Sequence, residues 1–234
     1  TSFEGPPQDD RHKSNTYASS TVATDGKLVY AFFEWAGLYV YDVGGALKWK
    51  VDLGSIQKAG LGPGTSPILY KNLIILVCDQ EMGEGSFVAG LDRTNGKEVW
   101  RAARTTRRSW ATPIVVNAAG RDELVVSGAE AVVAYDPASG TQLWTAPGTV
   151  SHPIPSFVTG RGLLFATAGS QAKVVLALRP GVQEDAANRV AWKYNKGTAY
   201  VASPIFYGDY LYLISDAGIM TCMDSVTGAL VYEG

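Results

Sequence analysis

A turn motif that recurs along the chain constrains the fold more than any other feature of the sequence. The motif is an aspartate, a glycine four residues later and a large aromatic residue eight residues after the aspartate. Full copies occupy segments 92–100, 136–144 and 224–232, and a copy one residue shorter occupies segment 42–49. A fifth copy is degraded, because Arg179 takes the aspartate position and an insertion precedes Trp192. The anchors at 42, 92, 136, 179 and 224 are separated by 50, 44, 43 and 45 residues, a period that indicates structural repeats.

Each repeat has a second landmark upstream of the aspartate, a small or proline-containing strand start followed by a turn and an apolar strand. In the second repeat these are Ser66-Pro67-Ile68, the turn Lys71-Asn72 and Leu73-Ile74-Ile75. Each unit therefore predicts four short strands separated by turns in about 45 residues, which is typical of a β-propeller blade. We expect an all-β fold of four-stranded blades after a polar N-terminal arm of residues 1–16. The predicted blades span residues 17–52, 64–103, 110–146, 153–194 and 200–234.

The composition excludes several other classes of protein. Apolar residues make up 46% of the chain, enough for a sizeable core. Twenty Lys and Arg residues against 22 Asp and Glu give a net charge of −2, so no overall basic field attracts nucleic acid. The longest apolar run, residues 73–78, has six residues, far short of the roughly 20 that span a bilayer as a helix. Two cysteines and two histidines are too few for a disulfide framework or a three-histidine metal site.

The repeated Asp-x-x-x-Gly-x-x-x-Trp segments resemble the tryptophan-docking repeat of the quinoprotein-like (PQQ-like) β-propellers, the family that includes BamB-like outer-membrane assembly lipoproteins. The resemblance covers roughly residues 17–234. The family usually has alanine two residues before the aspartate. That position here holds Val40, Gly90, Ala134, Ala177 and Cys222. Because this series is mostly small, we interpret Cys222 as a packing residue, and Cys78, which ends an apolar strand, in the same way.

The resemblance also implies a closed ring of seven or eight blades, whereas five repeats are visible. A blade buries its faces only against neighbouring blades, so an open arc of five leaves two apolar faces in water. We therefore expect the five repeats to be part of a seven- or eight-bladed ring. A closed five-bladed ring is the alternative.

The aromatic residue that ends each motif is predicted to be structural. A large ring on an outer strand can pack between adjacent blades and bury roughly 150–250 Å². The predicted docking residues are Trp49, Trp100, Trp144, Trp192 and Tyr232. The glycine of the motif is interpreted as a turn residue with positive φ, and the aspartate as an acceptor of hydrogen bonds from its own turn.

Two charged segments are expected on the rim where the innermost strands begin. One is the acidic loop 79–84, and the other is the arginine-rich link 101–108. The candidate partner-binding residues in these segments are Asp79, Glu81, Arg104, Arg107 and Arg108. Guanidinium groups suit carboxylates or phosphates of a partner. The alternative is a solvated surface whose charges pair with one another.

Aromatic residues precede several of the predicted innermost strands. They are Tyr17, Trp110, His152 and Tyr200. Because innermost strands begin at the mouth of the central channel, these residues are predicted to form a partial ring that lines a ligand or peptide site. The alternative is that they cap the strand starts and pack on neighbouring loops.

The resemblance implies two classes of function. The favoured one is a non-catalytic, extracytoplasmic binding or scaffold protein of the periplasm or cell envelope, which presents one rim to a protein or small ligand. The alternative is a dehydrogenase, since family dehydrogenases hold pyrroloquinoline quinone (PQQ) at the axis with Ca²⁺, and many have a disulfide between adjacent cysteines. Cys78 and Cys222 lie 144 positions apart, and no calcium carboxylate set is assigned by motif. In the dehydrogenase alternative, further blades supply the missing carboxylates. The favoured binding or scaffold function requires no cofactor.

Overall fold

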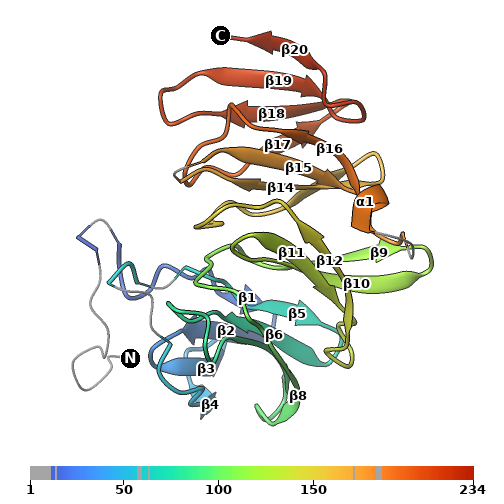
Figure 1. The fold of residues 1–234 in the computed structure, drawn as a ribbon. Coiled ribbons are helices and arrows are strands. Elements are labelled where there is room, and N and C mark those ends of the chain that lie inside the picture. The colour runs from blue at the N-terminus through green and yellow to red at the C-terminus, as the bar shows by residue number, and fades with distance from the viewer. Residues whose placement is uncertain (1–11, 14, 57–59, 63, 171, 183–185) are drawn as a thin grey trace.

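The computed structural model describes residues 12–13, 15–56, 60–62, 64–170, 172–182 and 186–234. They form five antiparallel four-stranded sheets, in each of which the strands pair in chain order, and the sheets are stacked along the chain (Figure 1). This arrangement confirms the predicted all-β fold of propeller blades, while closure into a larger ring stays a prediction. Most of the predicted N-terminal arm, residues 1–11 and 14, lies outside the described residues.

The strands are numbered outward from the innermost strand of each blade. Blade 1 contains β1 (Ala23–Thr24), β2 (Leu28–Phe33), β3 (Gly37–Asp42) and β4 (Leu47–Val51). Blade 2 contains β5 (Ile68–Tyr70), β6 (Leu73–Cys78), β7 (Phe87–Asp92) and β8 (Glu98–Ala103). Blade 3 contains β9 (Ile114–Ala118), β10 (Arg121–Ser127), β11 (Ala131–Tyr135) and β12 (Gln142–Pro147). Blade 4 contains β13 (Val158–Gly160), β14 (Leu163–Ala168), β15 (Val174–Leu178) and β16 (Val190–Tyr194), with the short helix α1 (Ala186–Arg189) before β16. Blade 5 contains β17 (Ile205–Tyr207), β18 (Tyr210–Ile214), β19 (Met220–Asp224) and β20 (Leu230–Glu233).

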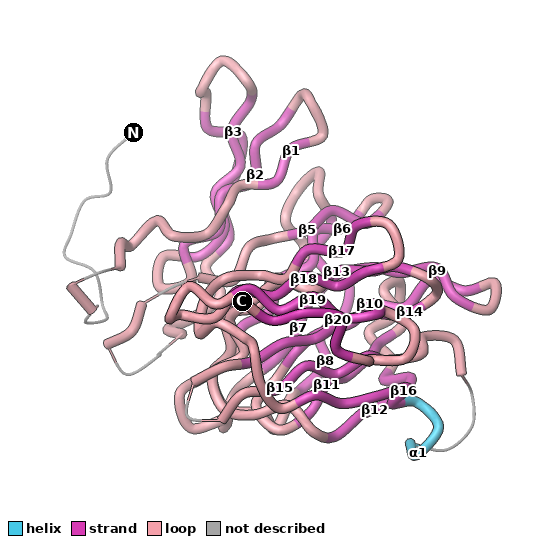
Figure 2. The backbone as a smooth tube through the Cα atoms, turned by 90° about the horizontal axis from the view of Figure 1, so that it is seen from above, coloured by secondary structure: helices cyan, strands magenta, loops and turns pink. Residues whose placement is uncertain are grey.

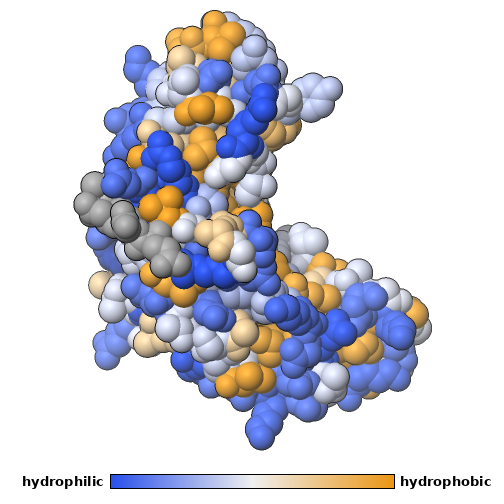
Figure 3. Space-filling view, turned by 90° about the vertical axis from the view of Figure 1, so that its right-hand side faces the viewer, coloured by the Kyte–Doolittle hydropathy of each residue, from blue (hydrophilic) through white to orange (hydrophobic). Residues whose placement is uncertain are grey.

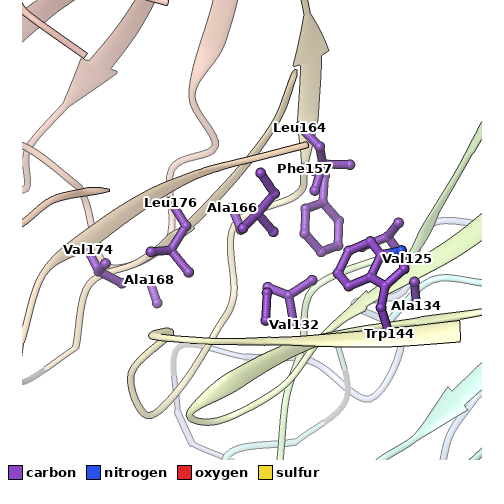
Figure 4. Packing of buried hydrophobic residues seen from close by; sticks show 12 residues of the cluster. Val125, Val132, Ala134, Trp144, Phe157, Leu164, Ala166, Ala168, Val174 and Leu176 are labelled. Carbon is purple, nitrogen blue, oxygen red and sulfur yellow. The ribbon is translucent and has the colours of Figure 1, made fainter. Parts of the chain in front are cut away.

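The core lies between the blades. The six residues of β6 are all buried, and they alternate between the two neighbouring blades as strand geometry requires. Ile74, Leu76 and Cys78 join a cluster with blade 1, whereas Leu73, Ile75 and Val77 join a cluster with blade 3. Two further clusters join blade 3 to blade 4 and blade 4 to blade 5. Figure 4 shows the one between blades 3 and 4, where the ring of Trp144 lies beside Phe157.

Three of the predicted docking tryptophans lie against the motif glycine of the following blade. A Cβ on Gly140 would stand 2.4 Å from Trp100 Cε3, and the equivalent distances are 2.7 Å from Gly96 to Trp49 and 2.6 Å from Gly228 to Trp192. Trp100 Nε1 also donates to the carbonyl of Pro137, and Trp192 Nε1 to that of Ser225. Both acceptors directly follow the motif aspartate, so the aromatic of one blade is bound by the turn of the next.

Trp144 makes a different contact, because the fourth repeat has no motif aspartate. Its Nε1 donates to Glu123 Oε2 at 2.8 Å, and Glu123 is buried in blade 3. The Glu123 carboxylate also accepts from Arg121 and from the backbone of Gly181. The Arg189 guanidinium lies 4.3 Å from the Trp144 ring centre, at the end of α1, the one helix of the described chain (Figure 2). Glu123 of blade 3 and Arg189 from the insertion of the fourth repeat thus hold this tryptophan in place of a motif turn.

The two end blades each have a free face. Tyr232 is 48% exposed on blade 5, together with Ile214 and Leu230, and apolar residues gather at this end of the molecule (Figure 3). No blade of the described chain lies against Tyr232, so its packing between blades stays a prediction. On blade 1, no atom lies within 4 Å of a Cβ built on Gly45, so this motif turn holds no aromatic ring.

Replacing Gly140 with alanine is expected to lower the free energy of unfolding by about 2–4 kcal/mol. The new methyl group would clash with Trp100, and alanine would also be strained by the positive φ at this position. Gly120→Ala is the matched control, since Gly120 has a φ of 79°, close to the 74° of Gly140, but nothing within 4 Å of its Cβ position. Urea unfolding of both variants measures the difference. Equal losses of stability would show that the ring contact contributes nothing.

Candidate functional site

The acidic loop after β6 and the link after β8 are joined by a buried ion pair. Arg104 donates to both carboxylate oxygens of Asp79, at 2.7 and 3.2 Å, and both side chains are almost fully inaccessible. Arg104 also bonds to Tyr135 Oη and to the carbonyl of Ser127 in blade 3. Ser109 also donates to Asp79 Oδ2, the oxygen that accepts from Arg104 Nη2. Asp79 and Arg104 are therefore not available to a partner as the sequence analysis expected, because they hold blade 2 to blade 3.

Glu81, Arg108 and His152 form a second, partly exposed group on the same rim. Arg108 pairs with Glu81 and directs its Nε and Nη2 atoms to His152 Nε2, at 3.2 and 2.8 Å. Because a guanidinium only donates hydrogen bonds, His152 Nε2 must accept and the ring is neutral. Burial lowers the pKa of His152 below its ordinary value, and the positive charge of Arg108 lowers this pKa further.

His152 also connects the aromatic residues predicted at the channel mouth. Its ring is stacked on Trp110 at 5.7 Å with an interplanar angle of 9°, and it meets Tyr200 edge-on at 6.4 Å. Trp110 is buried, and its Nε1 donates to the carbonyl of Gly62. Tyr17 lies elsewhere, against Trp35 at 6.1 Å. The structure thus brings three of the four predicted aromatics together, on the links that enter blades 3, 4 and 5.

Arg107 is the candidate of the arginine-rich link that stays exposed, and its guanidinium lies 3.8 Å from the sulfur of Met82. Met82 is itself 71% exposed. It is carried by a loop that is fixed through bonds from Gly83 N to the Gln80 carbonyl and from Gln80 N to Ser86 Oγ. The rim therefore presents a methionine and an arginine on a rigid support.

A cavity of about 500 Å³ opens beside this group, at the starts of the innermost strands. Its lining includes one hydroxyl residue from each blade, namely Thr21, Ser66, Thr112, Ser156 and Ser203. We call these five residues the hydroxyl ring. Sequence analysis noted the small strand starts to which they belong but assigned no function to their hydroxyl groups.

The residues that line this cavity do not fit the calcium and quinone of the family dehydrogenases. Apart from His12, the described lining residues are uncharged, and they include no carboxylate that could bind Ca²⁺. Across the described part of the chain, no three or more His, Cys, Asp and Glu side chains are grouped to bind a metal. Cys78 and Cys222 are buried in different blades, 2 and 5. No helix among the described residues is long and apolar enough to cross a membrane.

The family model of outer membrane protein assembly factor BamB matches residues 10–233. The chain belongs to the BamB family. The solved structure of BamB from Moraxella catarrhalis is similar, with a TM-score of 0.67 and 18% identity, over 92% of this chain and 64% of that one. No curated protein sequence matches the chain.

Two enzymes have the same blade architecture as this BamB-family chain. Quinohemoprotein alcohol dehydrogenase from Comamonas testosteroni has a TM-score of 0.67 at 14% identity, over 97% of this chain and 43% of the enzyme. A europium-containing methanol dehydrogenase has a TM-score of 0.62 at 16% identity, over 93% of this chain and 52% of the enzyme. At these identities the likeness shows the fold alone. The chain spans less than two thirds of the length of each of these structures.

His152 is expected to make the protein less stable as the pH falls. Its pKa is lowered in the folded state, so below pH about 6.5 the unfolded chain binds a proton that the folded chain does not, and unfolding is favoured. His152→Asn removes the titrating ring, and asparagine tolerates the positive φ of 61° at this position. The unfolding free energy of the variant should therefore depend less on pH between 7.5 and 5 than that of the parent protein.

Ala119→Asn is the control, because it introduces asparagine at another residue with positive φ, 50°, without removing a titratable group. If His152→Asn and the parent protein lose stability in parallel on acidification, the neutral state of His152 has no energetic role.

Proposed function

We propose that this BamB-family chain belongs to a non-catalytic, extracytoplasmic scaffold that presents the cavity-side rim to a protein partner. The description of the matched family as an outer membrane protein assembly factor supports a protein partner and a place in the cell envelope. The rim meant here comprises the loop 79–86, the link 104–112 and the segments around His152 and Tyr200.

The observation that carries the proposal is the combination of a rigid support with exposed side chains of the types favoured in interfaces. Met82 and Arg107 are exposed, and methionine, arginine and aromatic residues are enriched in protein interfaces. Beneath them, the buried pair Arg104–Asp79 and the stacked pair Trp110–His152 fix the backbone. A surface that is ordered before binding loses less conformational entropy when the partner binds.

Photo-crosslinking tests which rim meets the partner. A benzophenone amino acid at Met82 or Arg107, in the full protein in the cells that make it, is expected to give a crosslink to one discrete partner. The matched controls are Lys71 and Thr94. Both are exposed on the turns that follow β5 and β7, at the ends of these strands opposite to the rim. Those two turns are neighbours, since Arg93 N bonds to the Asn72 carbonyl. Crosslinks at the control positions and none at Met82 or Arg107 would contradict the proposal.

The competing function is that of a PQQ-dependent dehydrogenase, because the fold is similar to those of two dehydrogenases. Incubating the purified full-length protein with PQQ and Ca²⁺ should produce neither a bound-quinone absorbance band nor dye-linked oxidation of alcohols. The reason is that the described cavity has no carboxylate to coordinate the metal. A quinone band together with oxidation would overturn the non-catalytic proposal.

A further inference from the structure

The hydroxyl ring occupies one equivalent position in every blade. Each of its residues lies two positions before the first residue of the innermost strand, as Thr21 does before Ala23 and Ser66 before Ile68. The same spacing holds for Thr112, Ser156 and Ser203. All five residues line the cavity of about 500 Å³, a size that suits a small-molecule ligand.

Three of these hydroxyl groups already accept a hydrogen bond from the neighbouring blade. Thr21 N donates to Ser66 Oγ at 2.9 Å, Ser66 N to Thr112 Oγ1 at 3.3 Å, and Ser156 N to Ser203 Oγ at 2.9 Å. No acceptor for the hydroxyl protons of Ser66, Thr112 or Ser203 is found within the described part of the chain. A hydroxyl group whose oxygen accepts a hydrogen bond is a stronger donor through its own proton. The ring therefore offers polarised O–H donors to whatever enters the cavity.

The rest of the described lining is partly apolar and includes His12. Leu61, Ile154 and Val201 line it together with the aromatic residues Trp110 and Tyr200. Among the described lining residues there is no Lys, Arg, Asp or Glu. An ionised ligand would find no carboxylate, ammonium or guanidinium partner in the described lining, so the described lining favours a neutral ligand. A ligand with hydroxyl groups at its edge and apolar faces matches both kinds of lining.

The arrangement of the hydroxyl donors distinguishes between two classes of neutral ligand, extended peptides and compact ring-shaped molecules. An extended peptide presents its carbonyl groups along a line, at about 3.3 Å per residue. The hydroxyl ring instead places one donor from each of the five blades at the wall of one cavity. A compact ring-shaped ligand with hydroxyl groups on its circumference can reach several blades at once.

We propose that this cavity binds a neutral saccharide, with the hydroxyl ring bonding to the sugar hydroxyl groups and Tyr200 contacting a C–H face. The cavity shares Trp110, Thr112 and Tyr200 with the rim, but Met82 and Arg107 do not line it, so the two proposals can be tested separately.

Isothermal titration calorimetry on the full-length protein tests the ligand class. The neutral probes are maltose and N,N′-diacetylchitobiose, the charged probe is glucuronate, and the peptide probe is N-acetyl-triglycine amide. At least one neutral disaccharide is expected to bind with a Kd of about 1 mM or tighter, and the other two probes more weakly. No binding of either disaccharide, or tighter binding of the charged or peptide probe, would overturn the proposal.

Substitutions within the ring test the site. The Ser156 side chain makes no hydrogen bond inside the described part of the chain, so Ser156→Ala should weaken saccharide binding about tenfold without changing the unfolding midpoint. Ser55→Ala, at an exposed serine outside the cavity, is the matched control.

Thr112 provides a second pair of variants. Thr112→Val removes the hydroxyl at nearly constant shape and should weaken binding, whereas Thr112→Ser keeps the hydroxyl and should preserve it. If Ser156→Ala, Thr112→Val and their controls all bind the saccharide with equal affinity, the saccharide binds elsewhere and the proposed site is wrong. The crosslinks at Met82 and Arg107 are not affected by these outcomes, so failure of the saccharide site is distinguishable from failure of the rim proposal.

Discussion

The structure depends on the burial of both faces of each inner blade against its neighbours. In β6, β10 and β14, residues of opposite parity enter different clusters, so one strand contributes to two interfaces at once. A sheet of four short strands has no core of its own, and the fold exists only as a stack. This requirement explains why apolar runs without polar alternation, such as residues 73–78, occur in a chain whose sheets are antiparallel.

Polar contacts give the stack its order and direction. Aromatic rings on outer strands contact the turns of the following blade, and backbone N–H groups at the inner strand starts donate to the following blade's hydroxyl groups. Between blades 2 and 3, the buried Arg104–Asp79 pair adds a contact that is satisfied on all sides. The rim and the cavity are built from these same inter-blade contacts, so binding groups and structural groups are neighbours in the sequence.

The sequence predicted the blades because the motif period and the alternation of apolar strands are both local patterns. It predicted that Trp110, His152 and Tyr200 share one region, since all three precede innermost strands. It misplaced Asp79 and Arg104, because a residue's charge does not reveal whether its partner lies in the next blade. Glu123 was missed for the same reason: only the three-dimensional contact with Trp144 shows that its carboxylate takes the place of the turn carbonyl that accepts from Trp100 and Trp192 in other blades.

The hydroxyl ring has a consequence for how such molecules diversify. Every blade contributes one hydroxyl residue two positions before its innermost strand, and in three of the four neighbouring pairs the backbone N–H of one blade donates to the hydroxyl group of the next. Duplicating or deleting a whole blade would preserve this spacing while changing the number of hydroxyl groups at the cavity. Ligand size would then follow from the number of blades, and gene segments of about 45 residues would be the unit by which evolution adjusts it.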